Sequence, residues 1–175
     1  MIKRFIRKKL ISLVSDEKRK TAFKSLNTIH RLLILFDAAD YNEIKRFIET
    51  LKQKEKKEVV ACCYVSKKNP DTTLSDAILL RQKEDMNWMN IPSGAFINKL
   101  NQVHYDAVID LSLNDNLAME YVLANIHCSF KIGIRKKEFP LYDLTISSSD
   151  NDPLSIDYFG KQLLHYLKEI RSGNK

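Results

Sequence analysis

The chain opens with a helical pattern of apolar and basic positions. Apolar residues recur there at helical spacing: Ile2, Phe5, Ile6, Leu10 and Leu13. Basic residues fill the positions between them, which predicts a basic amphipathic helix. The segment from 15 to 27 is mostly polar and favours a further helical turn or a linker. We therefore expect a basic N-terminal arm at residues 1–27 and a single domain at residues 28–175.

From residue 31 onward, short apolar runs alternate with amphipathic stretches. The runs predict strands at 31–38, 58–65, 77–81, 105–111, 130–134 and 142–147. The stretches predict helices from Asp40 to Leu51, from Ser93 to Leu100, from Leu117 toward Cys128, and from near Asp152-Pro153 to near Gly173. This alternation indicates a three-layer, Rossmann-like α/β fold, with a mostly parallel sheet of about six strands and helices on both faces. The connections 66–76 and 135–141 look too short for helical crossovers, so one edge strand could be antiparallel.

Composition places the chain among ordinary globular proteins. It has 175 residues, of which 44% are hydrophobic and 29% charged, enough for one domain with a full core. No apolar run approaches the roughly 18 residues of a membrane span, and charge interrupts the first residues before a secretory signal can form. Cys62, Cys63 and Cys128 show no paired framework, so we expect buried thiols and a reducing, cytoplasmic location.

The net charge of +7 is confined to the arm. Residues 1–24 hold nine Lys or Arg and two acidic residues, whereas the whole chain holds 29 and 22, which leaves 20 of each in the rest. The body is therefore electrically balanced, and a nucleic-acid-binding surface spread across it is not expected.

The arm admits three interpretations. It lies on anionic lipid with its apolar stripe in the interface, it binds RNA phosphates, or it docks on the domain or on a second copy of the chain. Among partners outside the molecule, the inner face of the membrane fits best, which predicts a cytoplasmic protein held peripherally at that membrane. The candidate contact residues are Lys3, Arg4, Phe5, Ile6, Arg7, Lys8 and Lys9.

The loop from 85 to 90 reads Asp-Met-Asn-Trp-Met-Asn and holds the single tryptophan, Trp88. An exposed aromatic rim there would indicate a partner surface. A side chain that anchors the loop in the core is the favoured interpretation.

Polar residues gather where two predicted strands end. If strands 31–38 and 105–111 are neighbours, their carboxyl ends form the switch point at which doubly wound folds bind ligands. The candidate ligand-binding residues there are Asp37, Asp40, Asp110, Ser112, Asn114, Asp115 and Asn116.

These side chains fit three roles. Their carboxylates could hold a Mg²⁺-like cation, or form an acid/base pair. They could instead serve as helix caps and loop acceptors, with Asp40 and Glu43 as a capping box and Asn114 or Asp115 capping the next helix. So acidic a cluster argues against unaided phosphate binding, and no Gly-rich phosphate motif is present.

Residues 105–134 resemble the heptosyltransferases of lipopolysaccharide synthesis. The matching positions are Tyr105-Asp106, Ile109-Asp110-Leu111 and Lys131-Ile132-Gly133. The resemblance implies a Rossmann-like, glycosyltransferase-like layer order. It does not carry the activity, because the family's Gly-Asp turn is replaced by residues 36–40, Phe-Asp-Ala-Ala-Asp, and no residues remain for the family's second domain.

The chain is also similar, over most of its length, to an uncharacterised single-domain family from Bacteroidetes. The shared features are a basic arm, Phe36-Asp37 at the end of the first strand, Asn87-Trp88, and the turn from Asp110 to Asn116. This resemblance implies the fold and a cytoplasmic location, without an activity.

Two functions follow. The first is a non-enzymatic binding or scaffold module whose arm engages a partner, because the four histidines are scattered and no nucleophile or metal constellation is apparent. The second is a small enzyme acting on a sugar or nucleotide, with Asp37, Asp110 and Asp115 at the switch point. The sequence names no cofactor and no metal ligands.

Overall fold

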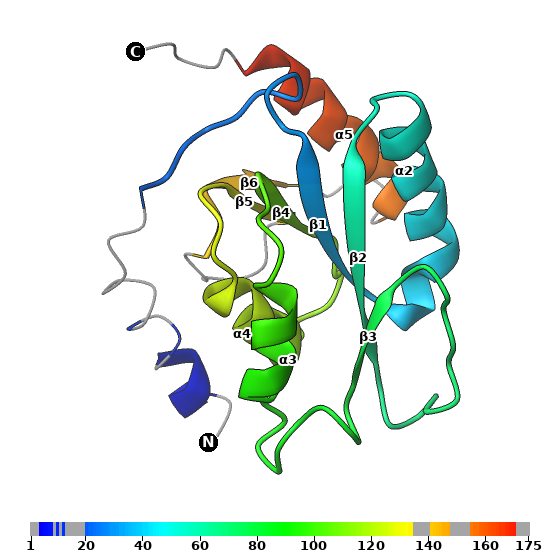
Figure 1. Ribbon diagram of the computed structural model, residues 1–175, viewed down its shortest axis with the longest axis vertical. Coiled ribbons are helices and arrows are strands. Elements are labelled where there is room, and N and C mark those ends of the chain that lie inside the picture. The colour runs from blue at the N-terminus through cyan, green and yellow to red at the C-terminus, as the bar shows by residue number, and fades with distance from the viewer. Residues whose placement is uncertain are drawn as a thin grey trace.

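The computed structural model describes residues 4–8, 10, 12, 20–134, 141–147 and 155–170. Its strands are β1 (Arg31–Asp37), β2 (Glu58–Val65), β3 (Ile78–Arg81), β4 (Ala107–Asp110), β5 (Lys131–Ile134) and β6 (Leu144–Ile146). Its helices are the short 3-10 turn η1 (Ala38–Asp40), α2 (Tyr41–Gln53), α3 (Gly94–Leu100), α4 (Leu117–Asn125) and α5 (Ile156–Glu169), as Figure 1 shows.

The strands form one sheet in the order β3-β2-β1-β4-β5-β6, and every neighbouring pair is parallel. The predicted Rossmann-like fold is confirmed, and neither edge strand is antiparallel. At one edge, the Arg81 guanidinium holds the β2–β3 connection by donating to the carbonyls of Pro70 and Thr72. At the other edge, the Asp143 carboxylate accepts from the Lys131 amide at 2.7 Å, which aligns β6 beside β5.

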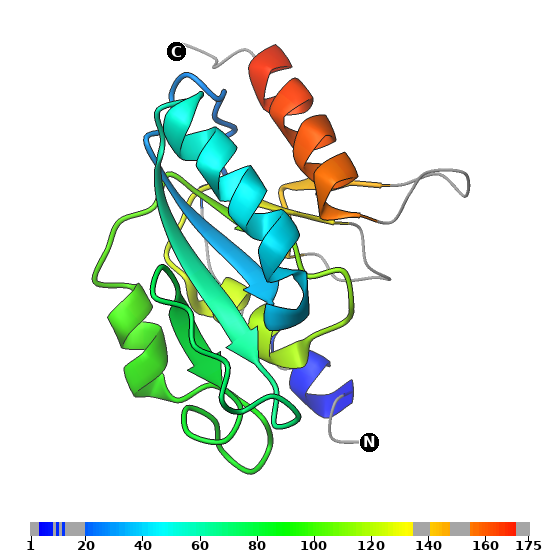
Figure 2. The same cartoon turned by 90° about the vertical axis from the view of Figure 1, so that its right-hand side faces the viewer.

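Helices cover both faces of the sheet. Figures 1 and 2 show α2 and α5 on one face and α3 and α4 on the other. Strand β1 serves both layers, because Ile34 and Phe36 pack toward α2 and α5 whereas Leu33 and Leu35 pack toward α3 and α4. A strand buried on both faces needs a continuous apolar sequence, which is the pattern that predicted it.

Helices α2 and α5 begin side by side because Glu43 ties them together. Its carboxylate accepts from the Ile156 amide at 3.1 Å, while Ser155 caps α5. The predicted Asp40–Glu43 capping box is therefore wrong: Asp40 occupies the N-cap position, but its side chain makes no capping hydrogen bond. The predicted cap at Asp152-Pro153 lies outside the described residues.

The three cysteines are buried thiols, as predicted. Burial, together with the nearby Asp37 carboxylate, raises the pKa of the Cys63 thiol to about 12. The thiol is therefore protonated at neutral pH and packs as a small apolar side chain.

The described part of the arm packs on the domain. Residues 4–8, 10 and 12 are helical, and Ile6 and Leu10 are buried in the same core as α3 and α4. Further along, the Ala22 amide donates to Ser129 and the Leu26 amide to Leu167. Lys3 and Lys9 lie outside the described residues. Within the part of the chain that the structure describes, no helix is long and apolar enough to cross a membrane.

Candidate functional site

The switch point of the sheet lies between β1 and β4, which are neighbours, as the predicted ligand site required. These strands pair in parallel with Leu35 opposite Asp110. After β1 the chain turns to α2 on one face, and after β4 it turns to α4 on the other face (Figures 1 and 2). The carboxyl ends of both strands therefore border the crevice where folds of this kind bind ligands.

A cavity of about 510 Å³ opens at this point, and we call it the switch-point cavity. Its polar and aromatic lining includes Asp37, Tyr64, Trp88, Asn114, Asp115 and Asn116. A second cavity of about 450 Å³ adjoins it, shares Asp37, Tyr64 and Asn114, and adds Asp40 and Lys68. Both volumes suit a small-molecule ligand.

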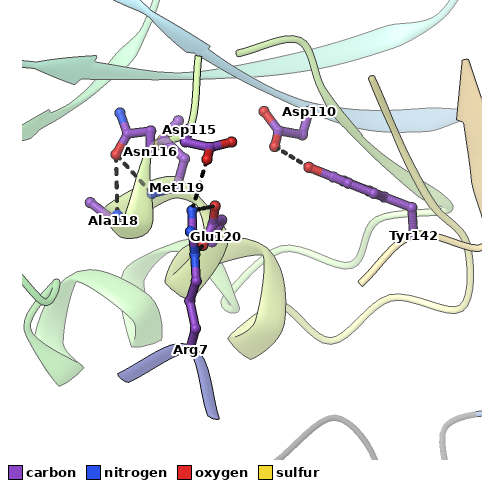
Figure 3. A network of polar contacts seen from close by, with 8 residues as sticks. All are labelled: Arg7, Asp110, Asp115, Asn116, Ala118, Met119, Glu120 and Tyr142. Carbon is purple, nitrogen blue, oxygen red and sulfur yellow. Dashed lines mark hydrogen bonds and ion pairs between the residues drawn. The ribbon is translucent and has the colours of Figure 1, made fainter. Parts of the chain in front are cut away.

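Asn116 builds one wall of the switch-point cavity. Its Nδ2 donates to Asp37 Oδ1 at 2.8 Å, which joins the end of β1 to the start of α4. Its Oδ1 accepts from the amides of Ala118 and Met119 (Figure 3). Asn116 is therefore the N-cap of α4, and the prediction that Asn114 or Asp115 would cap this helix is wrong.

Asp110 ends β4 but does not line the cavity. Its side chain is fully buried, with Oδ1 accepting from the Ser112 amide at 2.9 Å and Oδ2 from the Tyr142 hydroxyl at 2.7 Å. Burial and the adjacent Asp110 carboxylate raise the pKa of Tyr142 well above its usual range, so the phenol remains a donor. Asp110 thus has a structural position, as the capping and loop interpretation allowed.

Gly133 makes the Asp110–Tyr142 contact possible. It lies opposite Asp110 in the β4–β5 register, and a Cβ atom added to it would overlap the Tyr142 ring. The ring therefore crosses β5 at the one residue without a side chain. Close by, Ser112 is also fully buried, and its Oγ has no hydrogen-bond partner among the described residues.

Asp115 connects the cavity to the arm. Its carboxylate lies 3.3 Å from Arg7 Nη2, and the same guanidinium donates to Glu120 at 2.8 and 3.0 Å. Figure 3 shows Arg7 reaching up from the arm to both acids. Its hydrogen bond with the buried Glu120 outweighs desolvation and raises the pKa of Arg7 above its usual value.

The predicted carboxylates do not converge on one point. Asp37 faces Asn116, Asp110 faces Tyr142, and Asp115 faces Arg7. Burial raises the pKa of Asp40, which lines the adjoining cavity. Among the described residues, no three His, Cys, Asp or Glu side chains are grouped so that they could hold a metal ion.

Trp88 does not anchor its loop in the core, so the favoured interpretation is wrong. The side chain is 82% exposed and lines the switch-point cavity. The loop is held instead by Asn87, whose Oδ1 accepts from the Met89 and Ile91 amides, while Met86, Met89 and Ile91 pack against the core. These local bonds project Trp88 outward.

Sequence reasoning missed Tyr64, Tyr142 and Glu120. A signal existed for Tyr64, because the parallel β1–β2 register places it opposite Asp37 at the same end of the sheet. For Tyr142 and Glu120 no local signal exists, since their partners come from distant elements.

Comparison with known proteins places the chain in a family. A family model matches residues 2–170. The chain belongs to DUF6913, a family of unknown function. The DUF6913 match runs from the arm to the end of α5, and it confirms the expected membership of an uncharacterised family. The sequence matches no curated protein and no solved structure. The resemblance to heptosyltransferases is not confirmed.

Proposed function

We propose that the protein is a binding module that takes a small, uncharged, polyhydroxylated ligand, a sugar or a nucleoside, in the switch-point cavity. One observation carries the proposal: the same cavity is lined by carboxylates (Asp37, Asp115), carboxamides (Asn114, Asn116) and aromatic rings (Tyr64, Trp88). Carboxylates accept hydrogen bonds from hydroxyl groups, and carboxamides both accept from and donate to them. Aromatic rings pack on the apolar face of a sugar ring or stack on a base.

The charge of the cavity argues against a phosphate group. Asp37 and Asp115 would repel an anion, and Arg7 is engaged by Asp115 and Glu120. The first turn of α4 offers less to an anion than a bare helix N-terminus does, because the Ala118 and Met119 amides already donate to Asn116. An uncharged ligand meets neither obstacle.

A thermal-shift screen followed by calorimetry tests the proposal. The panel contains monosaccharides, nucleosides, nucleotide sugars, nucleoside triphosphates and Mg²⁺ salts. A monosaccharide or nucleoside at about 100 times its Kd should stabilise the protein by about 2.7 kcal/mol, which raises the melting temperature by several degrees.

Variants then locate the site. Asp37→Asn keeps an oxygen that can accept from Asn116, so it should fold normally and lose most of the ligand's effect. Glu49→Gln makes the same chemical change on the exposed face of α2 and should respond like the unmodified protein. The proposal fails if triphosphates stabilise the protein more than sugars and nucleosides do, or if Asp37→Asn responds fully.

A sugar- or nucleotide-acting enzyme is the second candidate, because Asp37 and Asp115 line one cavity and paired carboxylates can act as acid and base. In that case the binding compound would be converted to product, and either Asp37→Asn or Asp115→Asn would stop the conversion. Chromatography of the ligand after prolonged incubation separates the two functions, since a binding module returns it unchanged.

A further inference from the structure

The arm presents a second face that the domain does not cover. Ile6 and Leu10 point into the core and Arg7 reaches Asp115 and Glu120, whereas Arg4, Phe5 and Lys8 are exposed. Positions 4, 5 and 8 lie within about 100° of one another around a helix, so they share one side. Phe5 is 71% exposed, which is unusual for a large aromatic side chain between two cations. We call these three residues the outward face.

We infer that the outward face binds an anionic phospholipid surface while the arm remains docked on the domain. An anionic surface is the favoured partner because of its charge. Residues 1–24 hold nine basic and two acidic residues, whereas the rest of the chain holds equal numbers of each. An anionic bilayer supplies headgroup phosphates for Arg4 and Lys8 and an apolar interface for Phe5.

Two other occupants fit less well. A second copy of the chain would bring an equally basic arm, and the two arms would repel each other. A nucleic acid needs a basic track that continues over the body, whereas the switch-point cavity, which Arg7 borders through Asp115, is lined by Asp37 and Asp115.

The surroundings of Phe5 extend the same surface. Phe5 lines a cavity of about 390 Å³ together with Met89, Ile91 and Pro92, which belong to or adjoin the loop that carries the exposed Trp88. Tryptophan is enriched at membrane–water interfaces. In Figures 1 and 2 the helical part of the arm lies at the end of the molecule toward which the strands run. A bilayer bound there would face the end of the sheet that holds the switch-point cavity.

The docked geometry changes which residues meet the lipid. Ile6 and Leu10, which the sequence alone places in the lipid interface, are covered by the domain. Vesicle binding therefore depends on Arg4, Lys8 and Phe5, and it should weaken steeply as the salt concentration rises.

Flotation of the full-length protein with vesicles tests the inference. The vesicles contain phosphatidylcholine alone or phosphatidylcholine with phosphatidylglycerol. We expect binding only when phosphatidylglycerol is present. Replacing both Arg4 and Lys8 by Gln should weaken binding by about 25-fold, at about fivefold for each charge. Phe5→Ala should weaken it by about tenfold through lost apolar contact.

A matched control removes the same charge elsewhere. Lys52 and Lys54 are exposed at the carboxyl end of α2, which lies at the opposite end of the molecule. Replacing both by Gln should change vesicle binding by less than about twofold, because the site is beyond the Debye length from a bilayer at the outward face.

Three results would overturn the inference: equal binding to phosphatidylcholine alone, equal losses in the Arg4/Lys8 and Lys52/Lys54 variants, or binding of single-stranded RNA with no binding of vesicles. Melting temperatures should stay unchanged, because all the substituted side chains are exposed. If the Arg4/Lys8 variant misfolds, Phe5→Ala decides independently, and undiminished vesicle binding by that variant would reject the outward face.

Discussion

Two aspartates bracket strand β4 and hold the two ends of the sheet in different ways. Asp106, before the strand, accepts from Lys24 Nζ at 2.6 Å and from the amides of His30 and Arg31 at 2.9 and 3.0 Å. Asp110, at the end of the strand, accepts from the neutral Ser112 amide and Tyr142 hydroxyl. The Asp106 carboxylate is stabilised by the Lys24 cation. The Asp110 carboxylate is stabilised by the Tyr142 phenol, which packs over Gly133.

The comparison shows what each end is sensitive to. Burial alone would raise the pKa of Asp106, but the Lys24 hydrogen bond and the two amides outweigh it and lower this pKa to about 2. The amino end of the sheet should therefore respond to pH. The carboxyl end should respond instead to changes of shape, because Tyr142 reaches Asp110 only across Gly133.

The largest expected effect is at the carboxyl end. Gly133→Ala places a Cβ atom in the Tyr142 ring, so the phenol must leave the buried Asp110 carboxylate. We expect a loss of about 3 kcal/mol in the free energy of unfolding, measured by urea denaturation. Gly94→Ala is the control, since its Cβ would meet nothing within 4 Å, and it should change stability by no more than about 1 kcal/mol. Similar results for the two variants would show that the phenol contact contributes little.

At the amino end, Asp106→Asn should cost about 2 kcal/mol at pH 7. The folded pKa of about 2 lies below the value of 3.8 that is usual for an aspartate. The Asp106 carboxylate therefore stabilises the folded protein fully at pH values above its pKa in the unfolded chain. This stabilisation is lost as the pH falls through its lower pKa in the folded protein. Urea denaturation between pH 2 and pH 7 should show a flatter decline below about pH 4 for the variant. Asp157→Asn, which removes an exposed partner of Lys161, should change the curve much less, because solvent screens this pair. Parallel curves for Asp106→Asn and the unmodified protein would contradict the assignment.

The arm makes a smaller contribution to stability at the carboxyl end of the sheet. Arg7→Gln leaves the buried Glu120 without its guanidinium and should cost about 1 kcal/mol, a value reduced because Arg7 is 36% exposed. Adding Glu120→Gln should restore part of the loss, since the uncompensated buried charge is then gone. A double-mutant cycle measures the coupling, and additive losses would mean that the two side chains act independently.

The smallest expected effect on stability comes from Ser112, which is buried at the carboxyl end of the sheet. The Ser112 hydroxyl has no hydrogen-bond partner in the described part of the chain, so Ser112→Ala should be neutral or stabilising by about 0.5–1 kcal/mol. Thermal unfolding measures the sign. A clear destabilisation would instead indicate an ordered water bound to the hydroxyl.

The strands and the three-layer arrangement could be predicted because their signals are local. The apolar run of β1 and the alternation of strands with helices indicate a doubly wound sheet, and Ser93 caps α3 where the helix was predicted to begin. The structure differs from the prediction where a polar side chain hydrogen-bonds to a residue distant in the sequence. Glu43 binds the start of α5 instead of its own helix, and Asp110 binds Tyr142, which only the β4–β5 register brings near.

The candidate site was predicted in position but not in detail. Asp37, Asn114, Asp115 and Asn116 do line one cavity, because the carboxyl ends of parallel strands meet at one edge. Which side chain caps α4, and which acid is buried, depends on backbone geometry within two or three residues. The arm shows a similar limit, since an apolar stripe has the same pattern whether it packs on lipid or, like Ile6 and Leu10, on protein.

The central place of β1 has a consequence for the order of folding. This strand is synthesised first, yet one of its two neighbours, β4, begins at Ala107. The hydrogen-bond partners of the arm are synthesised later still, because the Ala22 amide donates to Ser129 and the Leu26 amide donates to Leu167 near the end of α5. During synthesis the arm therefore leaves the ribosome long before the surfaces that receive it exist. Closing such distant contacts is slow, so the most basic segment of the nascent chain completes its contacts only after α5 has been made.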